Sequence, residues 1–106
     1  MADISVVAII TAKAGEGDAV QTMLSDLAAA SQQEDGCVLY SLQRGVQDRD
    51  VFVTVEKWTS LDHLDKHMNG PSIAGAMASG GHLLAGAPQI VPAEVLGVGD
   101  PAKARY

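Results

Sequence analysis

Two strand-like segments of the chain are apolar on both of their faces. In residues 51–58 (VFVTVEKW), successive side chains point in opposite directions, so Val51, Val53 and Val55 share one face. The other face carries Phe52, Thr54, Glu56 and Trp58. Residues 4–12 (ISVVAIITA) also place apolar side chains on both sides. An antiparallel sheet with one solvent-exposed face alternates apolar and polar residues along its strands. The sheet predicted here therefore needs protein packed against both of its faces.

The segments around these strands predict helices and two further strands. We expect a helix from Asp18, as its N-cap, to about Gln33, with Gly36 supplying the left-handed residue at its end. A strand over 37–45 follows. Residues 59–69 and 71–79 predict two short helices, the first capped by Thr59 or Ser60 and the second opened by Pro71.

A last strand is predicted over residues 88–98, where Pro92 favours an edge position because proline cannot donate to a ladder. The order strand, helix, strand, strand, helical region, strand is typical of an α+β, ferredoxin-like split β-α-β protomer with an antiparallel sheet. We expect residues 1–98 to form this one domain and residues 99–106 to form a C-terminal tail.

The helices of such a domain cover one face of the sheet, and no other segment is long enough to cover the second. A second copy of the same sheet is the simplest cover, so we predict a homodimer with sheets packed face to face. The competing interpretation is that strand propensity alone explains the valines.

Composition excludes several classes of partner. Thirteen Asp and Glu against seven Lys and Arg give a net charge of −6, which disfavours binding to a nucleic-acid backbone. No apolar run is long enough to span a bilayer, and the first residues, MADISVV, lack the basic region and the cleavage site typical of an export signal. We therefore expect no membrane partner and a cytoplasmic location. Cys37 is the single cysteine and is interpreted as a small buried hydrophobe.

Candidate site residues gather around the strand 51–58 and the helix after it. A helical wheel places His67 at the edge of the face formed by Leu61, Leu64 and Met68, whereas His63 turns toward solvent. His67 is therefore a candidate acid, base or hydrogen-bond donor. The alternative is a half-buried histidine bonded to a backbone carbonyl. The His63-x-x-x-His67 spacing lacks a third ligand, so we expect no metal site.

Glu56 and Trp58 share one strand face, and a buried glutamate must be paired, protonated or on a cavity wall. Arg44 on the neighbouring strand is its expected partner. Trp58 offers a flat wall with one N–H donor, although most lone tryptophans are core residues. If Tyr40 points the same way as Trp58, the two rings could hold a planar aromatic ligand.

Taken in order, several of these stretches resemble the antibiotic biosynthesis monooxygenase family of dimeric α/β-barrel proteins. The resemblance runs from residue 4 to about 90. It includes Glu34-x-Gly36-Cys37-x-x-Tyr40, then Glu56-x-Trp58, then His67 followed by Pro71. It implies a ferredoxin-like protomer, a homodimer whose sheets form a barrel, and a ligand cavity between sheet and helices.

The resemblance also implies oxidation of a small phenol- or quinol-like aromatic compound with O2, using neither metal nor flavin as a cofactor. His67, Trp58 and Tyr40 would be the catalytic residues. Trp58 and Tyr40 would hold the ring, and His67 would move protons or donate to the oxyanion. The substrate-binding residues would be Glu56, Phe52, Arg44, Leu64 and Met77.

The chain departs from the family pattern at two places. Ser72 follows the proline where many relatives have histidine, and Met77 lies where haem-degrading relatives have an iron ligand, which disfavours haem. A non-oxidative isomerase, or a small-molecule binding protein on the same fold, remains the alternative, because fold does not fix function. A base paired with an oxyanion donor in the cavity would favour catalysis.

Overall fold

The computed structural model describes residues 3–105. Its element order is strand, helix, strand, strand, two helices and strand, with a short 3₁₀ turn before the last strand, as the sequence predicts. The elements are β1 (Ile4–Thr11), α1 (Gly17–Ser31), β2 (Cys37–Arg44), β3 (Val51–Trp58), α2 (Leu61–Met68), α3 (Pro71–Gly80), the 3₁₀ helix η1 (Gly81–Leu83) and β4 (Gln89–Ala93).

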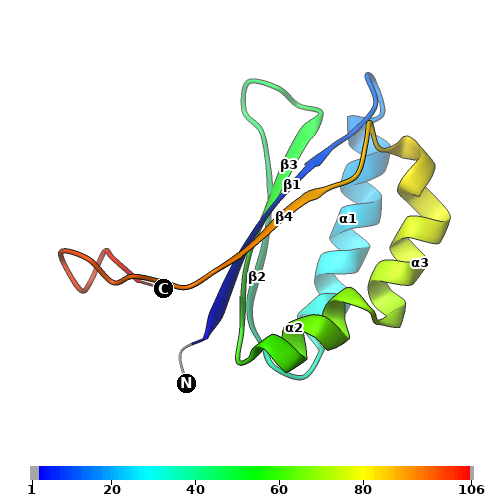
Figure 1. The fold of residues 1–106 in the computed structure, drawn as a ribbon. Helices are drawn as coiled ribbons and strands as arrows, with labels where there is room; N and C mark the ends of the chain where they lie inside the picture. The colour runs from blue at the N-terminus through cyan, green and yellow to red at the C-terminus, as the bar shows by residue number, and fades with distance from the viewer. Residues whose placement is uncertain (1–2, 106) are drawn as a thin grey trace.

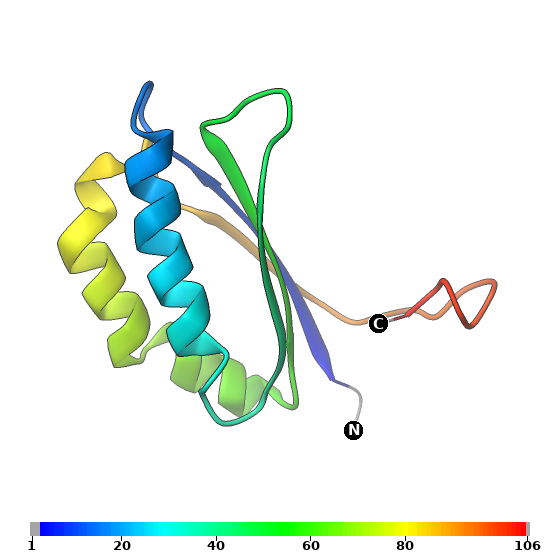
Figure 2. The same cartoon turned by 180° about the vertical axis from the view of Figure 1, so that it is seen from behind.

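The strands form one antiparallel sheet in the order β2-β3-β1-β4. Figures 1 and 2 show all three α-helices on one side of this sheet. This arrangement confirms the predicted α+β, ferredoxin-like protomer. No helix among the described residues is long and apolar enough to cross a bilayer.

The register between β1 and β3 places their side chains on the two faces of the sheet as the alternation of residues predicts. Ala8 of β1 lies opposite Thr54 of β3, and Val7 lies opposite Val55, so residues of one parity face the helices on both strands. The even positions of β3 are all buried against the helices. β4 pairs only with β1, which makes it the edge strand that Pro92 favours.

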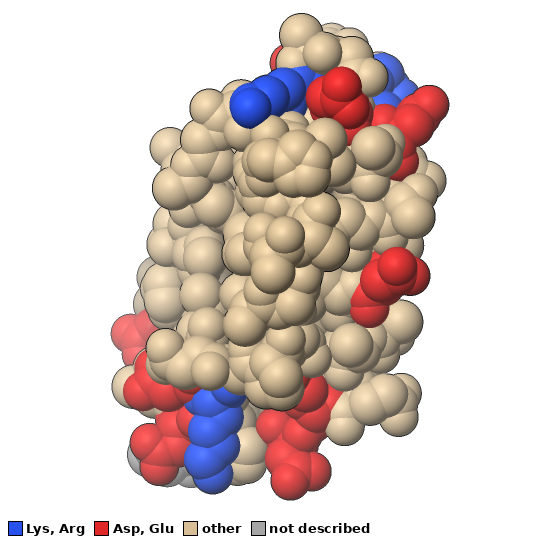
Figure 3. Space-filling model, turned by 90° about the vertical axis from the view of Figure 1, so that its right-hand side faces the viewer, with Lys and Arg blue, Asp and Glu red and all other residues tan. Residues whose placement is uncertain are grey.

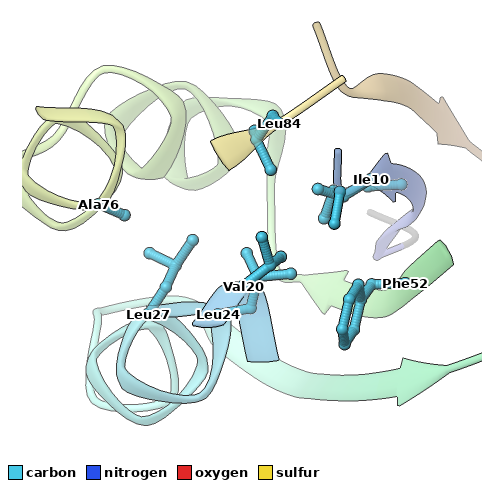
Figure 4. Close-up of a cluster of buried hydrophobic side chains, with 9 residues drawn as sticks. Ile10, Val20, Leu24, Leu27, Phe52, Ala76 and Leu84 are labelled. Atoms are coloured by element: carbon cyan, nitrogen blue, oxygen red, sulfur yellow. The ribbon is translucent and has the colours of Figure 1, made fainter. Parts of the chain in front are cut away.

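A cluster of buried apolar side chains joins the sheet to α1 and α3 (Figure 4). Phe52 from β3 and Ile10 from β1 meet Val20 and Leu24 from the inner face of α1. Burying each large side chain of this kind stabilises the fold by about 1.5–3 kcal/mol. The cluster holds α1 firmly across the sheet and so fixes one wall of the site described below.

The opposite face of the sheet remains largely apolar and uncovered. Val7, Ile9 and Val91 are 40%, 41% and 58% exposed, and Val53 and Val55 are partly buried beside them. Within the described residues, no helix lies over this face (Figures 1 and 2). The prediction that the helices cover only one face is therefore confirmed, whereas the second copy stays a prediction.

Two expected helix ends differ from the structure. Helix α1 begins at Gly17 with Glu16 as its N-cap, and Asp18 lies inside the first turn, where its carboxylate pairs with Arg44. The helix ends at Ser31 with a right-handed cap at Gln32. The left-handed residue, Gly36 at φ +82°, comes later and belongs to the turn that leads into β2. Both predictions were wrong: the helix begins one residue before Asp18, and residues 32–35 separate its end at Ser31 from Gly36.

The chain after β4 leaves the body of the protein. β4 ends at Ala93, earlier than predicted, and residues 94–105 add no further helix or strand. This segment runs away from the side that carries the helices (Figures 1 and 2). Residues 1, 2 and 106, which belong to the predicted domain and tail, lie outside the described part of the chain.

Charged side chains gather at the two ends of the helical face seen in Figure 3. Lys and Arg stand there beside Asp and Glu, and the middle of this face is largely uncharged. On the face shown, no basic patch of the kind that attracts phosphates is present.

Candidate active site

Glu56 occupies the inner face of the sheet and obtains its hydrogen bonds from its own strand. Residues two apart on β3 share a face, which places Thr54 and Trp58 on either side of the glutamate. The Thr54 hydroxyl donates to Oε2 at 2.7 Å, and the Trp58 indole N–H donates to Oε1 at 2.9 Å. Both carboxylate oxygens are satisfied although Glu56 is only 4% exposed. The alternation in β3 therefore builds a buried acid with its partners included.

His67 is brought over this acid by α2. The Ser60 hydroxyl caps the helix by accepting from the His63 backbone N–H at 3.2 Å. Helical spacing then buries His67 to 3% exposure and leaves His63 partly exposed, as predicted. The His67 ring stacks on the Trp58 ring at 4.4 Å between centroids and 29° between planes.

Carboxyl groups face both nitrogens of the His67 ring. Nδ1 lies 2.5 Å from Glu34 Oε1, a short hydrogen bond, and Nε2 lies 3.9 Å from Glu56 Oε1. The Tyr40 ring meets the imidazole edge-on, with centroids 5.9 Å apart. The imidazole is therefore fixed by a hydrogen bond at one nitrogen and by aromatic contacts on its face and edge.

A cavity of about 210 Å³ opens beside this group, between the sheet and the helices. Its polar lining comes from Tyr40, Thr54, Glu56 and His67. The rest of the lining is apolar and comes from β1, α1, the end of α2, α3 and the start of β4. These residues are Ala8, Ile10, Leu24, Leu27, Met68, Ile73, Met77, Pro88 and Ile90. An apolar chamber with a few convergent polar groups is typical of a small-molecule site.

Tyr40 lines this chamber, and its hydroxyl lies close to the Ser31 side chain. Burial, and then the nearby carboxyl of Glu56, raise the pKa of Tyr40 well above its usual value. The hydroxyl therefore keeps its proton throughout the physiological range. A protonated phenol beside a cavity can donate a hydrogen bond to negative charge that develops on a bound molecule.

Of the eight residues predicted for the site, four line the cavity: His67, Tyr40, Glu56 and Met77. Trp58 is fully buried behind His67 and does not line the cavity. Leu64 packs with Trp58 in a buried cluster, and Phe52 belongs to the other cluster, around Leu24.

Arg44 lies away from Glu56, and the prediction that these two residues pair is wrong. The register sets Tyr40 opposite Glu56 and Arg44 opposite Phe52, about 13 Å further along the strand. There the guanidinium bonds Asp18 at 2.9 Å and lies over the Phe52 ring, 5.1 Å from its centroid. Glu56 obtains its partners from its own strand instead.

The structure adds residues that the sequence did not single out. Glu34 was part of the family motif but had no assigned contact, and it now lies against His67. The apolar walls Ile73 and Ile90 come from α3 and β4. Thr54 shares the face of Glu56, so the strand alternation was the signal that pointed to it.

Cys37 is not a candidate nucleophile. Burial, and then the Glu56 and Glu34 carboxyls, raise the pKa of its thiol. Reactive cysteines have the opposite shift, because the thiolate is the nucleophile. Cys37 is only partly buried, rather than buried as expected, and it packs against the cluster that contains Trp58 and Tyr40.

Comparisons with known proteins agree with this fold. A Pseudomonas aeruginosa protein of known structure is 27% identical, with a TM-score of 0.84 over 91% of this chain and 96% of that one. A candidate antibiotic biosynthesis monooxygenase from Caulobacter crescentus is 29% identical, with a TM-score of 0.81 over 90% of this chain and 91% of that one. None of the curated proteins matches the chain.

The family profile described as antibiotic biosynthesis monooxygenase matches residues 3–79. That range contains the whole His67 group: Glu34, Tyr40, Thr54, Glu56 and Trp58. It also covers well over half of the 106 residues. The chain therefore belongs to the antibiotic biosynthesis monooxygenase family.

Proposed function

We propose that the protein is a monooxygenase that oxidises a small phenol with O2, without metal or flavin, in the cavity beside His67. The observation that carries the proposal is the pairing of two groups on one apolar chamber. His67, buried and fixed by Glu34 and Trp58, is the candidate base, and Tyr40, with its raised pKa, is the candidate donor. Membership of the family supports the reaction class.

The proposed chemistry needs little from the protein. His67 accepts the phenolic proton, and Tyr40 donates a hydrogen bond to the oxyanion that remains. The electron-rich ring then passes electrons to O2, a carbon–oxygen bond forms at a ring carbon that bears hydrogen, and the peroxide takes the proton back. Loss of water leaves a quinone. Overall, one phenol and one O2 give one quinone and one water.

The polar lining favours catalysis over simple binding. A site that only holds an apolar ligand needs no base and no donor, whereas this cavity has a candidate for each, His67 and Tyr40, next to the buried Glu56. Burying such polar groups costs stability unless they are bonded, and a protein that does only apolar binding gains nothing from them.

The cavity volume suggests the size of the substrate. A protein cavity of about 150 Å³ holds benzene. A chamber of about 210 Å³ therefore suits one aromatic ring with small substituents. We propose a single-ring phenol or quinol as the substrate class, rather than a polycyclic one.

Oxygen-electrode measurements with single-ring phenols and quinols test this proposal. We expect O2 uptake at least about 10-fold above autoxidation in buffer, with a quinone absorbance that grows in proportion. A polycyclic anthrone should be accelerated less. Uptake equal to autoxidation for every compound would remove the monooxygenase assignment.

We propose, in addition, that the working unit is a homodimer. The exposed valines of the uncovered sheet face, Val7 and Val91 among them, support this assembly, and so does the resemblance to dimeric barrel proteins. We also propose that the protein is located in the cytoplasm.

A further inference from the structure

We propose that Glu34 is a positioning residue, which keeps hydrogen on Nδ1 of His67 and leaves Nε2 free to accept a proton from a ligand in the cavity. This inference rests on the proposed function where it concerns catalysis. Its structural part, the state of the imidazole ring, stands independently and is measured without any substrate.

The turn that carries Glu34 is anchored to the helix that carries His67. The Glu34 N–H bonds Ser31 O at 3.1 Å, and Glu34 O accepts from the Cys37 N–H at 3.2 Å. Gly36 adopts the left-handed conformation, with φ +82°, that this turn requires. A Cβ at this position would lie 2.3 Å from the His63 ring, so the turn packs closely against α2. The Gly36 carbonyl also accepts from the Thr59 N–H at 2.9 Å, just before α2. The Glu34 carboxyl is thus held at a defined distance from α2.

The contact itself fixes the hydrogen on one nitrogen of the ring. An ionised Glu34 only accepts hydrogen bonds, so with Glu34 as a carboxylate the nitrogen that faces its Oε1 at 2.5 Å carries hydrogen. In the neutral ring the other nitrogen, Nε2, then has a free lone pair. Nε2 faces Glu56, whose Oε1 already accepts from the Trp58 indole at 2.9 Å. At 3.9 Å the Glu56 carboxyl is too far from Nε2 for a hydrogen bond, so the Nε2 lone pair stays available on a residue that lines the cavity.

The ring cannot easily turn over to exchange its two nitrogens. Trp58 stacks on its face and Tyr40 meets its edge, and His67 is only 3% exposed. With the ring held in this way, the identity of the Glu34 side chain decides which nitrogen carries hydrogen. A glutamine at this position can either accept from Nδ1–H through its amide oxygen or donate its amide hydrogen to Nδ1, so it allows the tautomer with hydrogen on Nε2, which a carboxylate excludes.

The test compares Glu34→Gln with Asp35→Asn, which removes the same charge from the adjacent, exposed residue. Nitrogen NMR of the ligand-free protein reads the tautomer of His67, assigned by its loss in His67→Ala. We expect hydrogen on Nδ1 in the parent and in Asp35→Asn, and a shift of the population toward Nε2 in Glu34→Gln. Turnover of the phenol should fall about 10–100-fold in Glu34→Gln alone. Glu34→Asp, which retains a carboxylate, should recover part of the parent tautomer population and part of the turnover.

Glu34 is 23% exposed on its side chain, so its substitution should leave the fold intact, and thermal unfolding checks this. A Glu34→Gln protein with the parent tautomer would overturn the inference. If the tautomer shifts as expected but the parent oxidises no phenol, the positioning by Glu34 is supported and the proposed oxidation is rejected. If the parent is active and Glu34→Gln matches Asp35→Asn in both measurements, the oxidation stands and the positioning role is rejected.

Discussion

Replacing His67 with alanine is expected to lower oxygen-dependent turnover of a single-ring phenol by about 10²–10⁴-fold, the usual contribution of a positioned base. The physical reason is that the apolar walls of the cavity disfavour an unpaired phenolate, so the proton needs an acceptor within the site. Tyr40 cannot replace that acceptor, because its raised pKa keeps it protonated. Rates of O2 uptake at saturating phenol measure the effect.

The matched control is His82→Ala, which removes an exposed histidine from η1. It should leave turnover unchanged. His67→Gln separates loss of the base from loss of packing against Trp58, because it keeps most of the side-chain volume but has no basic nitrogen. Parent-like turnover in His67→Gln would show that His67 acts through packing and would contradict the proposed role.

Replacing Val55 with glutamate is expected to convert a dimeric protein into a monomer. Val55 lies in the middle of the uncovered sheet face, opposite Val7 on β1 and Ser41 on β2. An unpaired carboxylate buried between two sheets costs several kcal/mol, and about 2.8 kcal/mol already weakens association about 100-fold. Sedimentation analysis at micromolar concentration should show the parent at twice the mass of one chain and Val55→Glu at the mass of one chain.

Val46→Glu serves as the control, because Val46 is 89% exposed in the loop between β2 and β3. The same substitution there should leave the dimer intact. A parent protein that sediments as a monomer throughout this concentration range would contradict the dimer and would leave the apolar sheet face unexplained.

Local periodicity was enough to predict the part of the site that lies on single elements. The period of two in residues 51–58 put Thr54, Glu56 and Trp58 on one face, and the structure confirms this. The helical period put His67 inward and His63 nearer to solvent, and the structure has His67 buried and His63 partly exposed. These predictions succeed because each depends only on the geometry of one strand or one helix.

Contacts between elements could not be read in the same way. Arg44 and Tyr40 lie on the same face of β2, and only the register with β3 decides which of them meets Glu56. A bulge between Cys37 and Leu39 shifts that register by one residue, and no pattern in the sequence predicts the bulge. The contact of Glu34 with His67 joins residues 33 positions apart through a turn, which no periodic pattern describes.

The role of Trp58 shows a second limit of sequence reasoning. Its place on the inner face of the sheet was predicted correctly. How deeply a side chain is buried between the sheet and the helices then decides whether it lines the cavity or packs behind the residues that do. Trp58 does not line the cavity and contacts the site through its stack on His67 and its hydrogen bond to Glu56, which both line it. Depth depends on how closely α2 approaches β3, which the sequence of either element does not specify.

The proton transfer to His67 is tested most directly with a phenol that does not react with O2. Para-nitrophenol absorbs in the visible only when ionised, so its spectrum in the cavity reports whether the site removes the proton. At a pH about one unit below its solution pKa, we expect the parent protein to bind it as the phenolate and His67→Ala to bind it as the neutral phenol. A bound spectrum that is neutral in the parent, or equally ionised in both proteins, would contradict the assignment of His67 as the base.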